Sequence, residues 1–179
     1  MRQFIAIDIE TGGLDPRIHP ITEVGLVFEH EGRIEEVEFS LPFDPTNCDP
    51  VALKVQKYGE REYAPQWSHY AASQYLVEVT RDKHLVGKNP WFDAGFIEVF
   101  LKDWGFNPGW HHRLVDVGCL AWGYVNGARS EQDAEPVRQP PNSGTVGDLM
   151  GLPLDAPSQH AALYDAKWAW DVFREVVPG

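Results

Sequence analysis

The chain has 179 residues, 43% of them hydrophobic, which is enough for one domain with a buried core. No apolar run approaches the roughly 20 residues that a membrane-spanning helix needs, and the N-terminus lacks a signal-peptide core, so we expect a cytoplasmic protein without a membrane partner. The formal net charge of -12 argues against broad electrostatic contact with nucleic acid, because surfaces that hold phosphates broadly are basic.

The first part of the chain predicts three strands in succession. Residues 3–10 alternate, with Asp8 and Glu10 on one face and isoleucines on the other, which indicates a mostly buried strand. Residues 21–30 and 33–41 predict two more strands, joined by a short turn at Glu31 and Gly32. We therefore expect an antiparallel hairpin after the first strand.

The rest of the chain alternates between helices and strands after a proline-rich segment over 42–64. Three strands followed by this alternation predict an α/β fold, a mixed sheet with helices on its faces. The expected elements are a helix over 65–82, a strand over 83–89, a helix over 90–105, a strand leading into a helix over 113–125, a polar loop over 126–144, a short helix near 145–150 and a last helix over 158–177.

Asp8 and Glu10 raise the question of what compensates two carboxylates in an apolar strand. Residues two apart on a strand point from the same face with Cα atoms about 6.5–7 Å apart, so one cation could reach both. For this pair alone, capping of the next turn or pairing with a lysine is an equal alternative.

Asp93 and Asp165 each lie on the apolar face of a predicted helix. Asp93 shares its face with Phe96 and Ile97, and Asp165 shares its face with Trp168, so both carboxylates are expected to point toward the sheet. The alternative for Asp93 is an acid that favours the helix dipole near the N-terminus.

His160 stands five residues before Asp165, at the expected entrance of the last helix. A lone histidine is more often a surface or capping residue than a catalyst. The four acids, however, point to the interior without an equal set of buried lysines or arginines. Two divalent ions, Mg²⁺ or Mn²⁺, are the simplest counter-charge, and such a pair can clamp the oxygens of an in-line phosphoryl displacement.

The stretches DIETGGL at 8–14, GKNPWFD at 87–93 and HAALYDA at 160–166 together form a specific pattern. In this order they resemble the DEDDh (DnaQ-like) family of 3′–5′ exonucleases in the RNase H-like superfamily. The resemblance implies a single 3′–5′ exonuclease domain over 1–179. It also implies a sheet whose first three strands are antiparallel and the later ones parallel, with helices on both faces.

The resemblance further implies two-metal hydrolysis that removes mononucleotides from single-stranded DNA or RNA 3′ ends. His160 matches the general base that activates the attacking water. The matched metal-binding acids are Asp8, Glu10, Asp93 and Asp165, and the matched substrate-binding positions are Thr11, Gly12, Leu14 and Asn89.

Two positions depart from the family pattern: Gly13 stands where a second threonine is common, and Lys88 where a histidine is common. Lys88 could supply a phosphate contact. Two other functions stay open, namely a non-cleaving nucleic-acid-binding or polymerase-associated module of the same fold, and an RNase H-like endonuclease. The preference for DNA or RNA, and the choice between a free enzyme, a homodimer and a polymerase subunit, also stay open.

Overall fold

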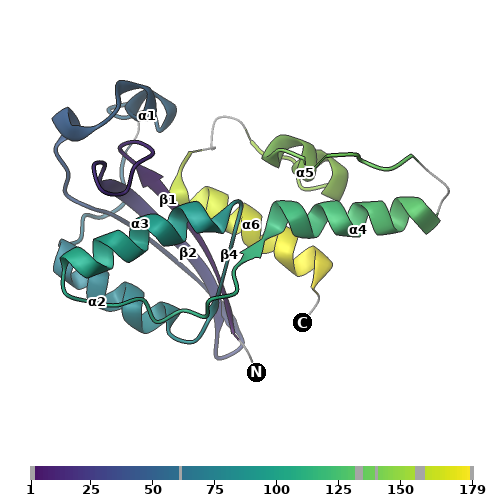
Figure 1. Cartoon of the computed structure of the whole chain (residues 1–179), viewed down its shortest axis with the longest axis horizontal. Coiled ribbons are helices and arrows are strands. Elements are labelled where there is room, and N and C mark those ends of the chain that lie inside the picture. Colours follow the sequence, from purple (N-terminus) through teal and green to yellow (C-terminus); the bar gives the residue numbers. More distant parts are fainter. Residues whose placement is uncertain (1–2, 61, 132–134, 140, 156–159, 178–179) are drawn as a thin grey trace.

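The structure, a computed structural model, describes residues 3–60, 62–131, 135–139, 141–155 and 160–177. It contains a five-stranded mixed sheet with helices on both sides (Figure 1). The strand order is β3-β2-β1-β4-β5. The strands are β1 (Phe4–Thr11), β2 (Ile21–His30), β3 (Arg33–Ser40), β4 (His84–Gly87) and β5 (Val115–Asp116).

The strand directions follow the sequence prediction. β1, β2 and β3 pair antiparallel, whereas β1–β4 and β4–β5 pair parallel. Glu31 and Gly32, which join β2 to β3, both have positive φ angles, of 50° and 76°. This is the backbone that a two-residue hairpin turn needs, and its twist matches that of the strands. The predicted mixed α/β sheet is confirmed.

The helices also follow the predicted order, with differences at their ends. They are the 3-10 helix η1 (Pro45–Asn47) and the helices α1 (Pro50–Val55), α2 (His69–Thr80), α3 (Pro90–Asp103), α4 (Val117–Glu131), α5 (Ser143–Met150) and α6 (Ala162–Val176). Within the described ranges, no helix has both the length and the apolar character needed to span a membrane.

The prediction that a helix starts at Pro65 is wrong. The Ser68 side chain accepts a hydrogen bond from the backbone N–H of Ala71 and caps α2, which starts at His69. The preceding Gln66 forms an isolated bridge with Ser40 instead. A serine cap satisfies an N–H group that would otherwise lack a partner, which favours the later start.

The prediction of a polar loop over 126–144 is also wrong in its first part, because α4 continues to Glu131. Asn126 does not end the helix. Its side-chain oxygen accepts the N–H of Val137 at 2.8 Å, and its side-chain nitrogen donates to the carbonyl of Val137 at 3.1 Å. An asparagine that looked like a loop residue is therefore a helix residue that holds the returning chain.

Two apolar layers lie on opposite faces of the sheet. Ile5, Ile7 and Ile9 of β1 pack with α2 and α3 on one face, while Ala6 packs with α4 and α6 on the other (Figure 1). Asp8 continues the row of Ala6, because side chains two apart on a strand share a face. The acids of β1 thus face α6.

The last helix starts later than predicted, at Ala162 rather than near 158. Residues 156–159, where its first turn was expected, lie outside the described residues. His160 has a φ of 64°, a left-handed backbone that a continuing α-helix excludes. His160 therefore lies just before the helix.

Candidate active site

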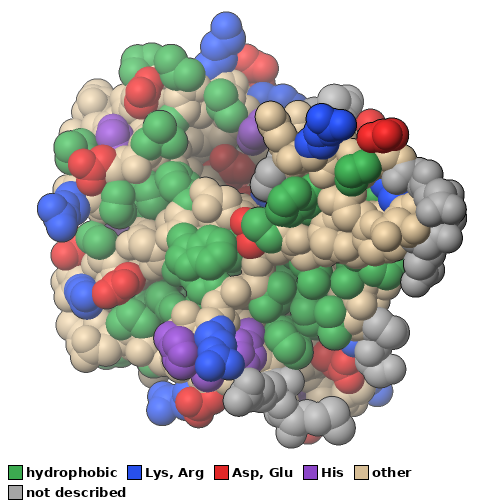
Figure 2. Space-filling view, turned by 45° about the vertical axis from the view of Figure 1, so that its right-hand side comes forward, with side chains coloured by type: hydrophobic (Ala, Val, Ile, Leu, Met, Phe, Trp, Pro, Cys, Tyr) green, Lys and Arg blue, Asp and Glu red, His purple; other side chains and the backbone are tan. Residues whose placement is uncertain are grey.

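A pocket of about 460 Å³ opens where β1, α3, α5 and α6 meet. In the space-filling view, acidic side chains lie in a recess of the surface (Figure 2). The lining residues are Asp8, Ile9, Glu10, Lys88, Asn89, Phe92, Asp93, Asn142, Ser143, Gly144, Leu154, His160, Asp165 and Trp168. All four acids singled out in the sequence, together with His160, thus line one pocket.

Asp8 and Glu10 lie on the half of β1 that extends beyond β4. The parallel ladder between β1 and β4 ends at the pair formed by Ala6 and Val86. Among the described residues, β1 therefore has no strand neighbour on that side at the acids. On its other side β2 continues, and Glu10 lies directly opposite Glu23. The acids are therefore held by a paired strand but remain open toward the pocket.

Asp93 reaches this open edge of β1 from the first turn of α3. Pro90 begins the helix after Asn89, whose left-handed backbone (φ 58°) turns the chain out of β4. The side chain of Asp93 is only 4% exposed, and its Oδ1 accepts the backbone N–H of Ile9 at 3.0 Å. The carboxylate thus satisfies an N–H that β4 leaves without a strand partner.

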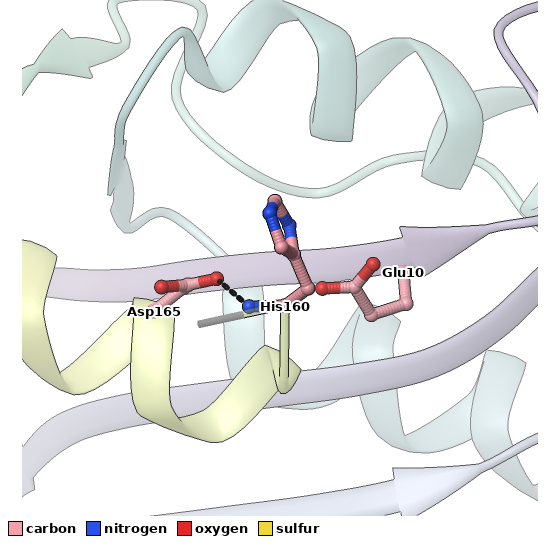
Figure 3. A group of neighbouring side chains, drawn as sticks. All are labelled: Glu10, His160 and Asp165. Atoms are coloured by element: carbon pink, nitrogen blue, oxygen red, sulfur yellow. Dashed lines mark hydrogen bonds between the residues drawn. The ribbon is translucent and has the colours of Figure 1, made fainter. Parts of the chain in front are cut away.

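Glu10, His160 and Asp165 form a tighter group within the pocket (Figure 3). One ligand atom of each lies within 4.8 Å of those of the other two, a spacing that could hold a metal ion. The Oδ2 atom of Asp165 also accepts the backbone N–H of His160 at 3.0 Å. This bond orders the residue just before α6 against the first turn of the helix.

Burial favours the protonated forms of Asp8, Asp93 and Asp165, and repulsion from neighbouring carboxylates adds to this effect at Asp8. Burial raises the pKa of Asp8 well above its usual value, and the charges of Asp93, Asp165, Glu10 and Glu23 raise it further. Burial raises the pKa of Asp93 to about 7, although the hydrogen bond from Ile9 opposes the shift. Burial also raises the pKa of Asp165, against the hydrogen bond and the charge of His160.

This donor set fits a divalent cation. Carboxylate oxygens are hard ligands of the kind that Mg²⁺ and Mn²⁺ prefer. A bound cation would offset the burial and the repulsion that together raise the pKa of Asp8. Among the described lining residues, Lys88 is the one lysine or arginine, so the side chains supply little positive charge of their own.

The residues expected to bind substrate separate into two groups. Lys88 and Asn89 line the pocket, and the amine end of Lys88 passes so close to Gly118 that a Cβ there would lie 2.6 Å from its Nζ. Thr11, Gly12 and Leu14 are not among the lining residues.

The second group lies at the end of β1 and in the loop that follows it. Thr11 Oγ1 donates to the Gly13 carbonyl at 2.6 Å, the Gly12 N–H donates to the Pro20 carbonyl at 2.8 Å, and Leu14 is 84% exposed. A role for these residues in substrate binding stays a prediction.

Sequence reasoning missed the wall of the pocket formed by Asn142, Ser143 and Gly144. Asn142 caps α5 by accepting the N–H of Thr145 at 2.9 Å. An asparagine directly before a helical segment is a cap signal, but it does not predict which pocket the cap lines. Glu23, fully buried in β2, was also missed, although an acid within the apolar run ITEVGLV is a visible signal.

The mixed sheet and the carboxylate pocket at the C-terminal end of its central strand define an RNase H-like α/β domain. The exonuclease family model named RNase T matches residues 5–173. The chain therefore belongs to this exonuclease family, and the DnaQ-like 3′–5′ exonuclease resemblance stated from the motifs is confirmed.

Named relatives agree with this assignment. The chain is 24% identical over 183 residues to DNA polymerase III subunit epsilon of Pasteurella multocida (strain Pm70), covering 98% of this chain and 68% of that protein. The structure is similar to that of E. coli ExoI in its zinc-bound complex with ssDNA, with a TM-score of 0.71 and 16% identity.

A second structure, E. coli Exonuclease I in complex with a dA16 oligonucleotide, gives a TM-score of 0.72 at 16% identity. Each of these two similarities covers 99% of this chain. The chain spans only about 40% of the length of the exonuclease I chains, 40% in the first complex and 41% in the second.

Proposed function

We propose that residues 1–179 act as one metal-dependent 3′–5′ exonuclease domain that removes mononucleotides from single-stranded 3′ ends. The observation that carries the proposal is the single pocket lined by Asp8, Glu10, Asp93, Asp165 and His160. Family membership supports the exonuclease class, and the single-stranded DNA in the complexes of E. coli exonuclease I supports the substrate.

The four carboxylates would hold two divalent ions, Mg²⁺ or Mn²⁺. Ions bound there would stabilise the negative charge that develops on the phosphate oxygens during in-line displacement. The chain itself contributes the fixed spacing of the oxygens, because Asp8 and Glu10 lie on a paired strand and Asp93 is bonded to the backbone between them.

His160 would act as general base. Its imidazole is exposed at the pocket, where it can take a proton from water as the water oxygen attacks the terminal phosphorus. The bond from phosphorus to the 3′ oxygen of the preceding nucleotide then breaks, and that oxygen leaves as a hydroxyl after taking up a proton. The products are a mononucleotide and a nucleic-acid strand that is shorter by one nucleotide.

Lys88 and Asn89 would orient the phosphate from the β4–α3 side of the pocket. Thr11, Gly12 and Leu14 would hold the terminal nucleotide at the nearby β1–β2 loop. The large exposed fraction of the Leu14 side chain, 84%, is consistent with a surface that a base covers on binding.

The named relative suggests a setting for this activity. Because it is a subunit of a bacterial DNA polymerase, association with a polymerase and a cytoplasmic location are proposed here, with a homodimer as the alternative assembly. Sedimentation of the purified chain, alone and with a replicative polymerase, separates the monomer, the dimer and the complex.

The activity test uses 5′-labelled single-stranded DNA and RNA oligonucleotides of matched sequence, with Mg²⁺ or Mn²⁺. We expect a descending ladder of labelled products. Asp93→Asn should reduce the rate at least about a hundredfold, because a buried ligand charge is lost, whereas Asp103→Asn at the exposed end of the same helix should not.

Three outcomes contradict the proposal in different ways. Internal cuts without a ladder would indicate an endonuclease. Binding of the oligonucleotide without any product would indicate a non-cleaving module. Equal activity of Asp93→Asn and the wild type would show that the carboxylate pocket is not the active site.

A further inference from the structure

The helix α6, which carries Asp165, begins without a side-chain cap of its own. Its N-cap residue is Ala161, whose side chain cannot accept a hydrogen bond. The first N–H groups of a helix have no partner within the helix, so something else must satisfy them. At this helix the partners come from the sheet.

Two glutamates of neighbouring strands accept the first two N–H groups of α6. Glu23 Oε2 on β2 accepts the N–H of Ala162 at 3.3 Å, and Glu38 Oε1 on β3 accepts the N–H of Leu163 at 3.4 Å. Glu23 is fully buried. Negative charge at a helix N-terminus is favourable because the helix dipole is positive there.

Between these two acids the helix backbone rests on the backbone of β2. Gly25 shares a face with Glu23 and lies directly opposite Glu38. A Cβ at Gly25 would lie 2.2 Å from the carbonyl carbon of Ala162 and 2.3 Å from the nitrogen of Leu163. Nonbonded atoms do not approach this closely, so only glycine at this position allows the backbone of α6 to lie so near the backbone of β2. We call Glu23, Gly25 and Glu38 the helix seat.

The helix seat is in register with the acids of β1. Gly25 pairs with Asp8, and Glu23 pairs with Glu10. The start of α6 is therefore placed directly beside these two carboxylates. Asp165 lies three residues after Ala162 in the sequence, and His160 lies two residues before Ala162.

Resting on the exonuclease activity proposed above, we propose that Glu23, Gly25 and Glu38 are positioning residues for the reaction. They fix the separation between the start of α6 and the sheet. This separation in turn sets the distance of His160 and Asp165 from Asp8 and Glu10. A displacement of about 1 Å in a catalytic group can cost about a hundredfold in rate.

The test compares three seat variants with two matched controls. Gly25→Ala should move the start of α6 away from β2. Glu38→Ala removes the acceptor of the Leu163 N–H, and Glu38→Gln restores an acceptor oxygen without the charge. The control Glu36→Ala removes a glutamate from the same strand that pairs with Lys167 of α6 at 2.8 Å, away from the helix start. The control Gly123→Ala adds a methyl group to α4, where nothing lies within 4 Å of the new atom.

Three kinds of measurement are made at a temperature well below unfolding. They are kcat and KM on a single-stranded oligonucleotide, the hydrogen-exchange rates of the Ala162 and Leu163 amides, and the affinity for Mn²⁺. Glu38→Ala and Gly25→Ala should lower kcat about 10- to 100-fold with KM changed less than about threefold, and should weaken Mn²⁺ binding. Exchange of the Leu163 amide, whose acceptor is Glu38, should quicken at least about tenfold in Glu38→Ala. Glu38→Gln should recover most of the lost kcat and most of the lost protection of this amide.

Each outcome either supports or overturns the proposed role of the helix seat. The inference is overturned if Glu38→Ala matches Glu36→Ala in kcat, amide exchange and Mn²⁺ affinity, or if Glu38→Gln recovers nothing. If Gly25→Ala does not fold, the two Glu38 variants still give the answer. If the wild type degrades no oligonucleotide, the proposed function fails, and amide exchange and Mn²⁺ affinity alone then judge the helix seat.

Discussion

The role of His160 is the sharpest question at the level of single residues. Its imidazole lies close enough to the carboxylates of Glu10 and Asp165 to be a metal ligand, whereas the proposed mechanism makes it a base. His160→Ala should lower turnover by about 10²- to 10⁴-fold while the affinity for Mn²⁺ changes less than about threefold, because only the proton acceptor is lost.

Titration calorimetry with Mn²⁺ and a single-turnover cleavage assay check this prediction. His112→Ala, at an exposed histidine, is the control and should leave both quantities unchanged. A parallel loss of Mn²⁺ affinity and turnover in His160→Ala would make the histidine a ligand, and unchanged turnover would reject both roles.

The acids of the pocket could be predicted from the sequence because local geometry places their side chains. Asp8 and Glu10 follow from the period of two in a strand, and Asp93 follows from the period of a helix. Glu23 was missed because the N–H of Ala162, with which it bonds, is 139 residues away in sequence. A contact of that range requires the folded sheet.

At the level of secondary-structure elements, the hairpin was easier to predict than the helix ends. Alternating residues and a two-residue turn define β2 and β3 locally, and the structure places both close to where the sequence did. The end of α4 was misplaced because Asn126 and Gly127 resemble a loop, whereas contacts with Val137 stabilise the helix there. Tertiary contacts overrode the local preference.

The contact between α4 and the segment after it can be tested with Asn126→Ala. Asn126 makes two hydrogen bonds to the backbone of Val137, and Trp122 Nε1 donates a third, at 2.6 Å, to the same carbonyl. Loss of the amide should cost about 1–3 kcal/mol of local stability, because a part-buried backbone N–H loses its partner.

Limited digestion with trypsin provides the measurement, since Arg138 is exposed next to Val137. Cleavage after Arg138 should be about tenfold faster or more in Asn126→Ala, as local opening becomes more frequent. Asn107→Ala, at an exposed loop residue, is the control. Equal cleavage rates in Asn126→Ala and the wild type would show that these hydrogen bonds do not hold the segment.

At the level of the whole molecule, the raised pKa values make the stability of the metal-free protein depend on pH. A carboxyl group whose folded pKa exceeds its unfolded value binds more protons in the folded state, so its contribution to stability decreases as pH rises. For Asp93, with a pKa of about 7 against an ordinary 3.8, this decrease extends from about pH 4 to pH 7.

Thermal unfolding in EDTA between pH 5 and pH 8 tests this dependence. Asp93→Asn should gain stability relative to the wild type as pH rises, because the amide has no charge to bury. In saturating Mg²⁺ the wild type should be more stable than Asp93→Asn, since ions would bind the deprotonated carboxylates of the folded wild type. An Asp93→Asn advantage that is constant or shrinks with pH would contradict the raised pKa.

The net charge of -12 makes a prediction for nucleic-acid binding. If contacts are confined to the pocket, only one or two phosphates meet a basic side chain, and each should give a slope of about -0.7 in log affinity against log salt for a single strand. Between 50 and 200 mM salt, KM should then rise about threefold per contact.

Lys88→Met should remove about one such contact and flatten the dependence, whereas Lys102→Met on the exposed side of α3 should not. KM values over a salt series check this expectation. A rise of a hundredfold or more in the wild type would mean that a wide basic surface, rather than the pocket, binds the strand.

The hydrogen bond from Ile9 to Asp93 joins α3 to the one residue that separates Asp8 from Glu10. Backbone and side chain thereby lock three carboxylates from two elements into a single rigid unit. Binding of cations would then require no folding transition at these three groups, because the entropic cost of bringing them together is met when the chain folds. The remaining adjustable member is Asp165, whose place depends on how α6 is anchored.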